Sequence, residues 1–315
     1  MICGNEKKSI RKVFGETLVE IGKENKDIVV LDADLALSTQ TCIFEKAFPE
    51  RFFDIGIAEQ DMVTTAAGLA SEGKIPFVAS FAMFVTGRTY DQIRNAVCYP
   101  KLNVKIIGTH GGVTVGEDGA SHQALEDIGL MRGLPNMTVI VPVDCNECAQ
   151  AVEYAANIKT PVYIRIPRAN VVDIFGDNYR FNPQKAVTYK EGTDVTIISN
   201  GETMAQVIDA AELLSLEGIN AEVISMPVIK PLDSETVINS ARKTGFVVTV
   251  ENHSVINGLG SAVCEVLAEN YPVKVLRIGV NDEFGQSGKA NELLDFYGLN
   301  AEKIKQKIIL SIKNL

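Results

Sequence analysis

The chain has 315 residues, of which 46% are hydrophobic and 22% charged, and a formal net charge of −10. This length and balance are typical of a globular protein with two domains and a large buried core. Acidic and basic residues are interspersed without a basic face, and the longest apolar runs have strand length. We therefore expect neither nucleic-acid binding nor a membrane span.

The first residues and the cysteines favour an intracellular protein. Residues 1–12 have no apolar core behind their charges, so we expect no secretory signal and predict a cytoplasmic location. The six cysteines are scattered, as in reduced cytosolic proteins, rather than arranged as a disulfide framework. Cys145 and Cys148 form a C-x-x-C pair without the further ligands of a metal site, so we interpret them as structural.

The first half alternates helical and strand patterns. Apolar spacing predicts a helix over residues 9–24, and a near-continuous apolar run at 28–35 predicts a strand buried on both faces. Similar runs lie at 77–81, 104–108, 138–143 and 162–166, with helices predicted at 89–98 and 145–157. This order predicts an α/β fold, with a mostly parallel, doubly wound sheet covered by helices on both faces.

A polar, turn-rich stretch near residues 176–193 predicts a domain boundary. Beyond it the alternation restarts, with strands predicted at 195–199, 221–226, 246–252 and 273–279 and helices at 203–216, 234–241 and 260–269. We therefore predict a first domain at residues 1–185 and a smaller α/β domain at residues 190–315.

The first candidate functional residue is Glu59. It stands where a short apolar strand at 52–57 gives way to a helix of small residues at 58–71. A buried carboxylate must be paired or protonated, so its position favours a ligand that exchanges a proton with it. The small residues suit tight packing within one domain or across a subunit interface, and composition leaves both open.

Two further segments follow predicted strands, where α/β sheets place their ligands. Phe81 and Phe84 would share a helix face if the strand ended before them; such pairs usually belong to the core, but here they could stack on a flat ring. The glycine-rich loop at 109–123 holds two of the three histidines. It could bind a metal or serve only as structure, but it lacks helical ligand spacing, and we favour a hydrogen-bonding rim for a polyhydroxylated substrate.

Three strings together carry a family resemblance: DIGIAEQ at 54–60, HGGVTVGEDGASHQ at 110–123 and MRGLPNMTVIVPVD at 131–144. They resemble transketolase, and more closely its C-terminal half, which prokaryotes can encode as a separate subunit. The specific motifs cover about residues 10–168, and the remainder resembles the family's C-terminal domain more loosely.

The resemblance implies a pyrimidine-binding domain followed by a C-terminal domain, with thiamine diphosphate bound at a dimer interface. The family's metal-binding GDG motif has no match here. The resemblance therefore implies an N-terminal partner subunit that holds the diphosphate through Mg²⁺ or Ca²⁺, and two copies of each subunit. It implies transfer of a two-carbon ketol unit between sugar phosphates, in the pentose phosphate pathway.

The resemblance also assigns cofactor residues. Glu59 matches the catalytic glutamate that shares a proton with the pyrimidine ring nitrogen. Phe81 and Phe84 match the aromatic residues that flank that ring. The family's third aromatic would fall at Gly87, which cannot stack, so Tyr90 is the candidate replacement.

The substrate side matches as well. In the family, one set of residues binds the sugar hydroxyls and another binds the distal phosphate. The residues that match the hydroxyl set are His110, Asp118 and His122, with Asp118 placed for the C2 hydroxyl. The residues that match the phosphate set are Arg11, Ser38, His122 and Arg168. Arginine suits phosphate because its fork donates two hydrogen bonds at once. Gly111 and Gly112 depart from the polar residues that the family often has there.

Alternative functions remain open. A deoxyxylulose-phosphate synthase-like subunit shares part of the motifs, although His110 favours transketolase. A non-catalytic interaction module could keep the fold without turnover, although intact Glu59, His110, Asp118 and His122 argue against it. The role of the second domain is not indicated; its segment 250–261, with His253, is better explained as a capped helix start in an assembly contact than as a ligand site.

Overall fold

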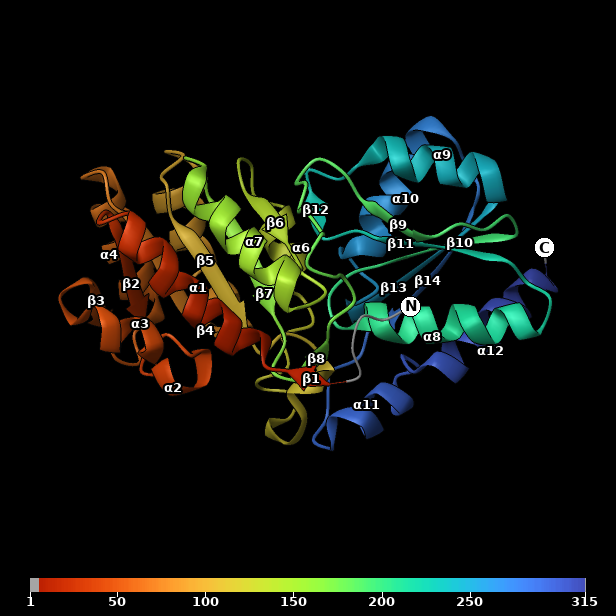
Figure 1. The fold of residues 1–315 in the computed structure, drawn as a ribbon, viewed down its shortest axis with the longest axis horizontal. Coiled ribbons are helices and arrows are strands. Elements are labelled where there is room, and N and C mark those ends of the chain that lie inside the picture. The colour runs from red at the N-terminus through yellow and green to blue at the C-terminus, as the bar shows by residue number, and fades with distance from the viewer. Residues whose placement is uncertain (1–5, 315) are drawn as a thin grey trace.

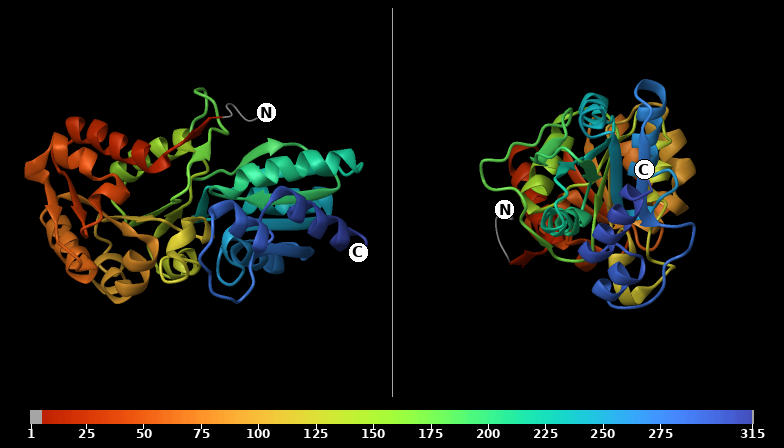
Figure 2. Two further views of the ribbon diagram at one scale, coloured as in Figure 1. Left: turned by 90° about the horizontal axis from the view of Figure 1, so that it is seen from below. Right: turned by 90° about the vertical axis from the view of Figure 1, so that its right-hand side faces the viewer.

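The computed structural model describes residues 6–314. Within this range the strands form a seven-stranded sheet, a five-stranded sheet and a two-stranded ribbon. Figure 1 shows the two larger sheets with their helices next to each other along the long axis of the molecule, and the left view of Figure 2 shows the same arrangement from below. The right view of Figure 2 looks along that axis. Residues 1–5 and Leu315 lie outside the described residues, and with them Cys3 and part of the N-terminal segment interpreted above.

The seven-stranded sheet confirms the predicted doubly wound fold of the first half. Its order is β12-β6-β7-β5-β4-β2-β3, where β12 (Val228–Lys230) comes from the second half, and all neighbouring pairs except β12 with β6 are parallel. The strands from the first half are β2 (Ile28–Asp32), β3 (Phe52–Asp54), β4 (Ile75–Phe81), β5 (Lys105–Thr109), β6 (Thr138–Ile140) and β7 (Val162–Ile166). β2 ends before the apolar run does, because Asp34 takes a positive φ of 59°.

Helices cover this sheet and connect its strands. Ser9 caps α1 by accepting a hydrogen bond from the Lys12 amide. The longer helices are α1 (Ile10–Glu24), α4 (Glu59–Ser71) and α7 (Cys145–Asn157). The shorter ones are α2 (Ala36–Thr39), α3 (Cys42–Ala47), η1 (Pro49–Arg51), α5 (Tyr90–Gln92), η4 (Val113–Asp118) and α6 (Asp127–Arg132).

The helix predicted at 89–98 differs from the prediction. It begins earlier, and its turns are π-helical in η2 (Met83–Arg88) and in η3 (Ile93–Cys98). The hydroxyls of Thr86 and Thr89 donate to the carbonyls of Ala82 and Val85, at 2.7 Å and 2.5 Å. Such bonds to the preceding turn compete with the helical ladder and bend helices.

The second sheet has the order β14-β13-β10-β11-β9. Its strands are β9 (Val187–Lys190), β10 (Val195–Ser199), β11 (Ala221–Ser225), β13 (Phe246–Ser254) and β14 (Lys274–Val280). Its helices are α8 (Thr203–Leu216), α9 (Ser234–Thr244), α10 (Leu259–Asn270), α11 (Ala290–Phe296) and α12 (Ala301–Ile312). β9 pairs antiparallel with β11, so part of the polar stretch at 176–193, in which a domain boundary was predicted, belongs to this sheet.

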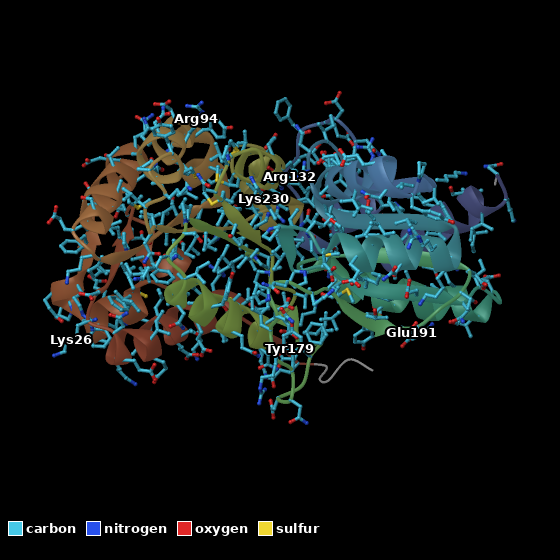
Figure 3. The ribbon with its side chains drawn as sticks, turned by 90° about the horizontal axis from the view of Figure 1, so that it is seen from above. Lys26, Arg94, Arg132, Tyr179, Glu191 and Lys230 are labelled. Atoms are coloured by element: carbon cyan, nitrogen blue, oxygen red, sulfur yellow. The ribbon has the colours of Figure 1, made fainter. Side chains whose placement is uncertain are left out.

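The chain crosses the predicted division at β12 (Val228–Lys230), which comes from the second half but pairs with β6 of the seven-stranded sheet. The two-stranded ribbon, in which β1 (Lys7–Lys8) pairs with β8 (Val171–Val172), lies within the first half. Figure 3 shows Lys230 beside Arg132, whose carbonyl accepts a hydrogen bond from Lys230 Nζ at 2.8 Å. The division into residues 1–185 and 190–315 stays a prediction.

Two features of residues 6–314 bear on the cysteines and on membranes. Cys145 and Cys148 are buried free thiols, and burial raises the pKa of Cys145 to about 12, which fits the structural interpretation. Over the same residues no three His, Cys, Asp or Glu side chains are grouped to hold a metal ion, and no helix has the length and apolarity to cross a bilayer.

Candidate active site

The predicted site residues lie at one edge of the seven-stranded sheet. The parallel strands β3, β4, β5 and β7 lead at their carboxyl ends into segments that carry Glu59, Phe84, His110 and Arg168. Arg11, in the first turn of α1, reaches the same edge, because its guanidinium donates to the Arg168 carbonyl at 3.2 Å. Open α/β sheets bind their ligands at this edge.

Glu59 is the first residue of α4 and is only 3% exposed. Its Oε1 accepts a hydrogen bond from Nη1 of Arg88 at 2.7 Å, and a helix N-terminus also favours a negative charge. The Arg88 side chain is half exposed and lies over the Phe84 ring, 4.3 Å from its centroid. Arg88 was not predicted as a site residue, because nothing in the spacing along the chain connects it to a carboxylate 29 positions earlier.

Aromatic rings line the site beside Glu59. The centroids of Phe81 and Phe84 are 5.8 Å apart with nearly parallel planes, and Phe81 stacks on His110 at 3.8 Å. His122 meets Phe84 edge-on at 5.2 Å. The condition for a shared helix face is not met, since Phe81 is the last residue of β4. The two rings meet because η2 begins directly after the strand.

His110 is buried, with 3% of its surface exposed. Burial, aided by the charge of Arg11, lowers its pKa to about 3, so the ring is neutral near pH 7. Its Nδ1 lies 2.9 Å from Thr109 Oγ1, which donates its own proton to the Ser80 carbonyl at 3.3 Å. The contact with Thr109 fixes the orientation of the neutral ring, which has one N–H and one lone pair for hydrogen bonding.

The arginines form a positively charged corner. Nη1 of Arg11 donates to the Ser38 carbonyl at 2.5 Å, so Ser38 contributes its main chain to this contact. Arg11 Nε is buried without a hydrogen-bond partner, and burial and Arg168 lower the pKa of this side chain. Arg168 donates to the Val115 carbonyl at 2.5 Å and to Glu117 at 3.3 Å. An anion could satisfy this corner through paired N–H groups.

The remaining predicted residues are more open. Asp118 is exposed at the end of η4, and His122 is partly exposed with Nδ1 2.9 Å from Ser121 Oγ. Tyr90 lines a cavity of about 550 Å³ together with Leu130 and Phe284. Among the described residues no ring contact joins Tyr90 to Phe81 or Phe84, so the structure offers no support for Tyr90 as the replacement aromatic.

Comparisons with known proteins agree with this architecture. A model of the transketolase pyrimidine binding domain matches residues 6–173, and a model of the transketolase C-terminal domain matches residues 184–304. The fold and the site thus define a member of the transketolase family, and the chain belongs to it.

Within the family it corresponds to the C-terminal subunit of a split transketolase. It is 52% identical to a Methanocaldococcus jannaschii protein provisionally named transketolase C-terminal section, with 97% of each chain covered. It is 40% identical to an apulose-4-phosphate transketolase subunit of Phocaeicola vulgatus, over 96% of this chain and 97% of that protein. A solved structure described as a split gene transketolase, inactive beta4 tetramer, superposes with a TM-score of 0.90 at 51% identity, covering 97% of this chain and 98% of that one.

Proposed function

We propose that this chain, together with an N-terminal partner subunit, transfers a two-carbon ketol unit between sugar phosphates with thiamine diphosphate. The observation that carries the proposal is the convergence of a buried carboxylate, stacked rings and an arginine corner at one sheet edge. Glu59, Phe81, His110 and Arg11 come from separate parts of the sequence and meet there.

The residues present fit the pyrimidine ring of the cofactor. The Phe81 and Phe84 rings offer a flat apolar surface, and Glu59 supplies a buried carboxylate next to it. The half-exposed Arg88 covers Phe84 and pairs with Glu59, so a planar ring could take over both contacts when Arg88 swings into solvent. When bound, thiamine diphosphate supplies the nucleophilic carbon and the electron sink that cleavage of a ketose carbon–carbon bond requires.

Each group of this chain then has a definite task. Glu59 holds a proton between its carboxylate oxygen and a ring nitrogen. The neutral His110 binds a substrate hydroxyl through Nε2, and Asp118 and His122 bind further hydroxyls. Arg11, the Ser38 segment and Arg168 bind the distal phosphate with charge-assisted hydrogen bonds. The phenylalanine rings exclude water from the carboxylate.

The partner subunit completes the site in this proposal. It holds the diphosphate through Mg²⁺ or Ca²⁺, and two copies of each subunit assemble in the cytoplasm. An apolar surface near Glu59 supports a seam at this point, because Leu37 and Ile57, which follow neighbouring strands, are each 78% exposed. A side chain in place of Gly68 in α4 would meet open space, so packing within this chain does not explain that glycine.

The test combines the purified chain with the purified N-terminal subunit, thiamine diphosphate and magnesium. Ketol transfer from xylulose 5-phosphate to ribose 5-phosphate should appear in the mixture and in neither subunit alone. Condensation of pyruvate with glyceraldehyde 3-phosphate instead would establish the synthase-like alternative. A stable complex that catalyses neither reaction and cleaves no ketose phosphate across a panel of donors would favour a non-catalytic module.

A further inference from the structure

The loop at residues 110–123, here called the rim loop, is held in place from outside its own sheet. The Val113 amide donates to Oδ1 of Asn252 at 2.9 Å. Nδ2 of Asn252 donates to Glu202 Oε1 at 2.6 Å, and Thr114 Oγ1 donates to the same oxygen at 2.9 Å. Asn252 belongs to β13 and Glu202 precedes α8, so both come from the second sheet and its helices.

The Asn252 amide has a single chemically sensible orientation. The Val113 amide can only donate and the Glu202 carboxylate can only accept, so the oxygen of Asn252 must face Val113 and its nitrogen must face Glu202. Asn252 is 2% exposed, and its second N–H reaches Thr114 Oγ1 at 3.3 Å. A buried polar network in which every group is satisfied specifies one arrangement and penalises others.

Two adjacent glycines near the start of the rim loop make this approach possible. Gly112 has a φ of +78°, and a Cβ on it would lie 2.3 Å from Nδ2 of Asn252. A Cβ on Gly111 would lie 2.3 Å from Nε of Arg165. The glycines at which this sequence departs from the family's polar residues are therefore explained by contacts with Asn252 and Arg165.

The buried Arg165 and Gln123 extend the same attachment. Nη2 of Arg165 donates to the carbonyls of Asn252 and Ala124, at 2.9 Å and 3.1 Å, and so joins β13 to the end of the rim loop. Nε2 of Gln123 donates to the carbonyl of Gly116 at 3.1 Å and to that of Gln286, in the second half of the chain, at 2.9 Å. The loop is thus attached to the second half of the chain near its start, through Val113 and Thr114, and at its end, through Gln123.

We infer that Asn252 is a positioning residue, through which the second domain holds the rim loop in the conformation that binds substrate. This inference rests on the proposed function, because it takes His110, Asp118 and His122 as substrate-binding groups. It gives the second domain a role: it sets the shape of the substrate rim, while Glu59 and the phenylalanine rings are fixed by their own sheet. Disturbing Asn252 should therefore weaken substrate binding more than it slows the chemical step.

A charge swap tests the inference. Asn252→Asp places a second carboxylate against Glu202, and the two repel each other. Glu202→Gln keeps an acceptor in the same shape. In the double variant Asn252→Asp/Glu202→Gln, the new amide at position 202 donates to the new carboxylate at position 252, so the hydrogen bond is restored with donor and acceptor exchanged. Thr249→Val, on the same strand, removes a buried hydroxyl that has no hydrogen-bond partner and serves as the matched control.

Hydrogen–deuterium exchange of the chain alone is the first readout, and it does not depend on catalysis. In Asn252→Asp the amides of residues 112–123 should exchange at least about tenfold faster, while those of β4, β5 and β10 stay protected. In the complex with the partner subunit, KM for the ketose phosphate should rise about tenfold with kcat nearly unchanged. The double variant should recover both readouts, and Thr249→Val should change neither.

Two results would overturn the inference. The first is that Asn252→Asp has the same hydrogen–deuterium exchange rates and the same KM as the wild type. The other is faster exchange spread evenly over both sheets without recovery in the double variant, which would show a general structural role. If the wild-type complex has no ketol transferase activity, the proposed function fails, but the exchange experiment still decides whether the second domain holds the rim loop.

Discussion

Two buried glutamates occupy comparable places in the two sheets and have different surroundings. Glu59 begins α4 at the carboxyl edge of the first sheet, and Glu251 lies near the carboxyl end of β13, close to the start of α10. Glu251 accepts hydrogen bonds from the amides of Leu259 and Gly260, at 2.7 Å and 2.8 Å. Both of its oxygens therefore cap its own domain's helix.

Glu59 bonds instead to the side chain of Arg88, which can move away. A buried carboxylate at a helix start therefore indicates a ligand site only when the amides of that helix do not already donate hydrogen bonds to it. Gly258 contributes to the difference, since a Cβ there would lie 2.0 Å from Glu251 Oε2 and push the carboxylate from its cap. The interpretation of segment 250–261 as a capped helix start agrees with these bonds, while its place in an assembly contact stays a prediction.

The largest expected effect is that of Glu59→Gln on turnover. The amide cannot share the proton that the proposed role requires, so kcat of the assembled enzyme should fall by at least about 100-fold. The thermal midpoint of the chain alone should stay within a few degrees of the wild type. Glu72→Gln, an exposed position at the end of the same helix, is the control and should retain full activity. Near-normal turnover in Glu59→Gln would show that Glu59 does not share a proton with the cofactor.

Glu251→Gln should show the opposite behaviour. The variant side chain keeps one acceptor oxygen but points its NH₂ group at a helix amide, so that two donors face each other. This should lower the free energy of unfolding by about 1–3 kcal/mol. Urea denaturation of the chain alone measures this, with the exposed Glu269→Gln of the same helix as the control. The folded fraction should keep its kcat; a loss of kcat at full stability would give Glu251 a role in the reaction.

His110 should reveal itself in the acid stability of the chain. Its pKa is about 3 when folded and near 6.5 when unfolded, so the unfolded state gains a proton first as the pH falls below 6.5. This difference in proton binding lowers the free energy of unfolding by about 2 kcal/mol at about pH 5 and leaves it unchanged above about pH 7.5. His110→Gln removes the effect, so denaturation curves of the two proteins should diverge only on the acid side. A parallel pH dependence would show that His110 is protonated in the folded chain near pH 6.

Phe84→Leu should have the smallest effect. Leucine keeps much of the apolar volume but loses ring stacking, which is worth about 0.5–1.5 kcal/mol, so Kd for thiamine diphosphate in the complex should rise about 2–10-fold. Isothermal titration calorimetry measures the change, and Phe296→Leu, a largely exposed ring of α11, is the control. A lower thermal midpoint at unchanged Kd would show that Phe84 contributes to core packing and not to cofactor binding.

Local pattern predicted much of the fold. The helices Cys145–Asn157 and Thr203–Leu216 and the strand Val162–Ile166 begin and end where apolar periodicity places them. β12 was not predicted, because three residues carry too little pattern and their partner strand lies far away in the sequence. The π-helical turns after Phe81 also escaped prediction, since they depend on threonine hydroxyls that bond to the preceding turn.

The sequence by itself determined the family, the parallel sheet and the position of Glu59 at the start of a helix, because these follow from nearby residues and ordered motifs. Only the tertiary structure decided that Arg88 pairs with Glu59, that His110 is neutral beside Arg11, and that Asn252 bonds to the rim loop. The physical reason is that burial and hydrogen bonding between distant segments depend on where the folded strands end, which spacing along the chain does not specify.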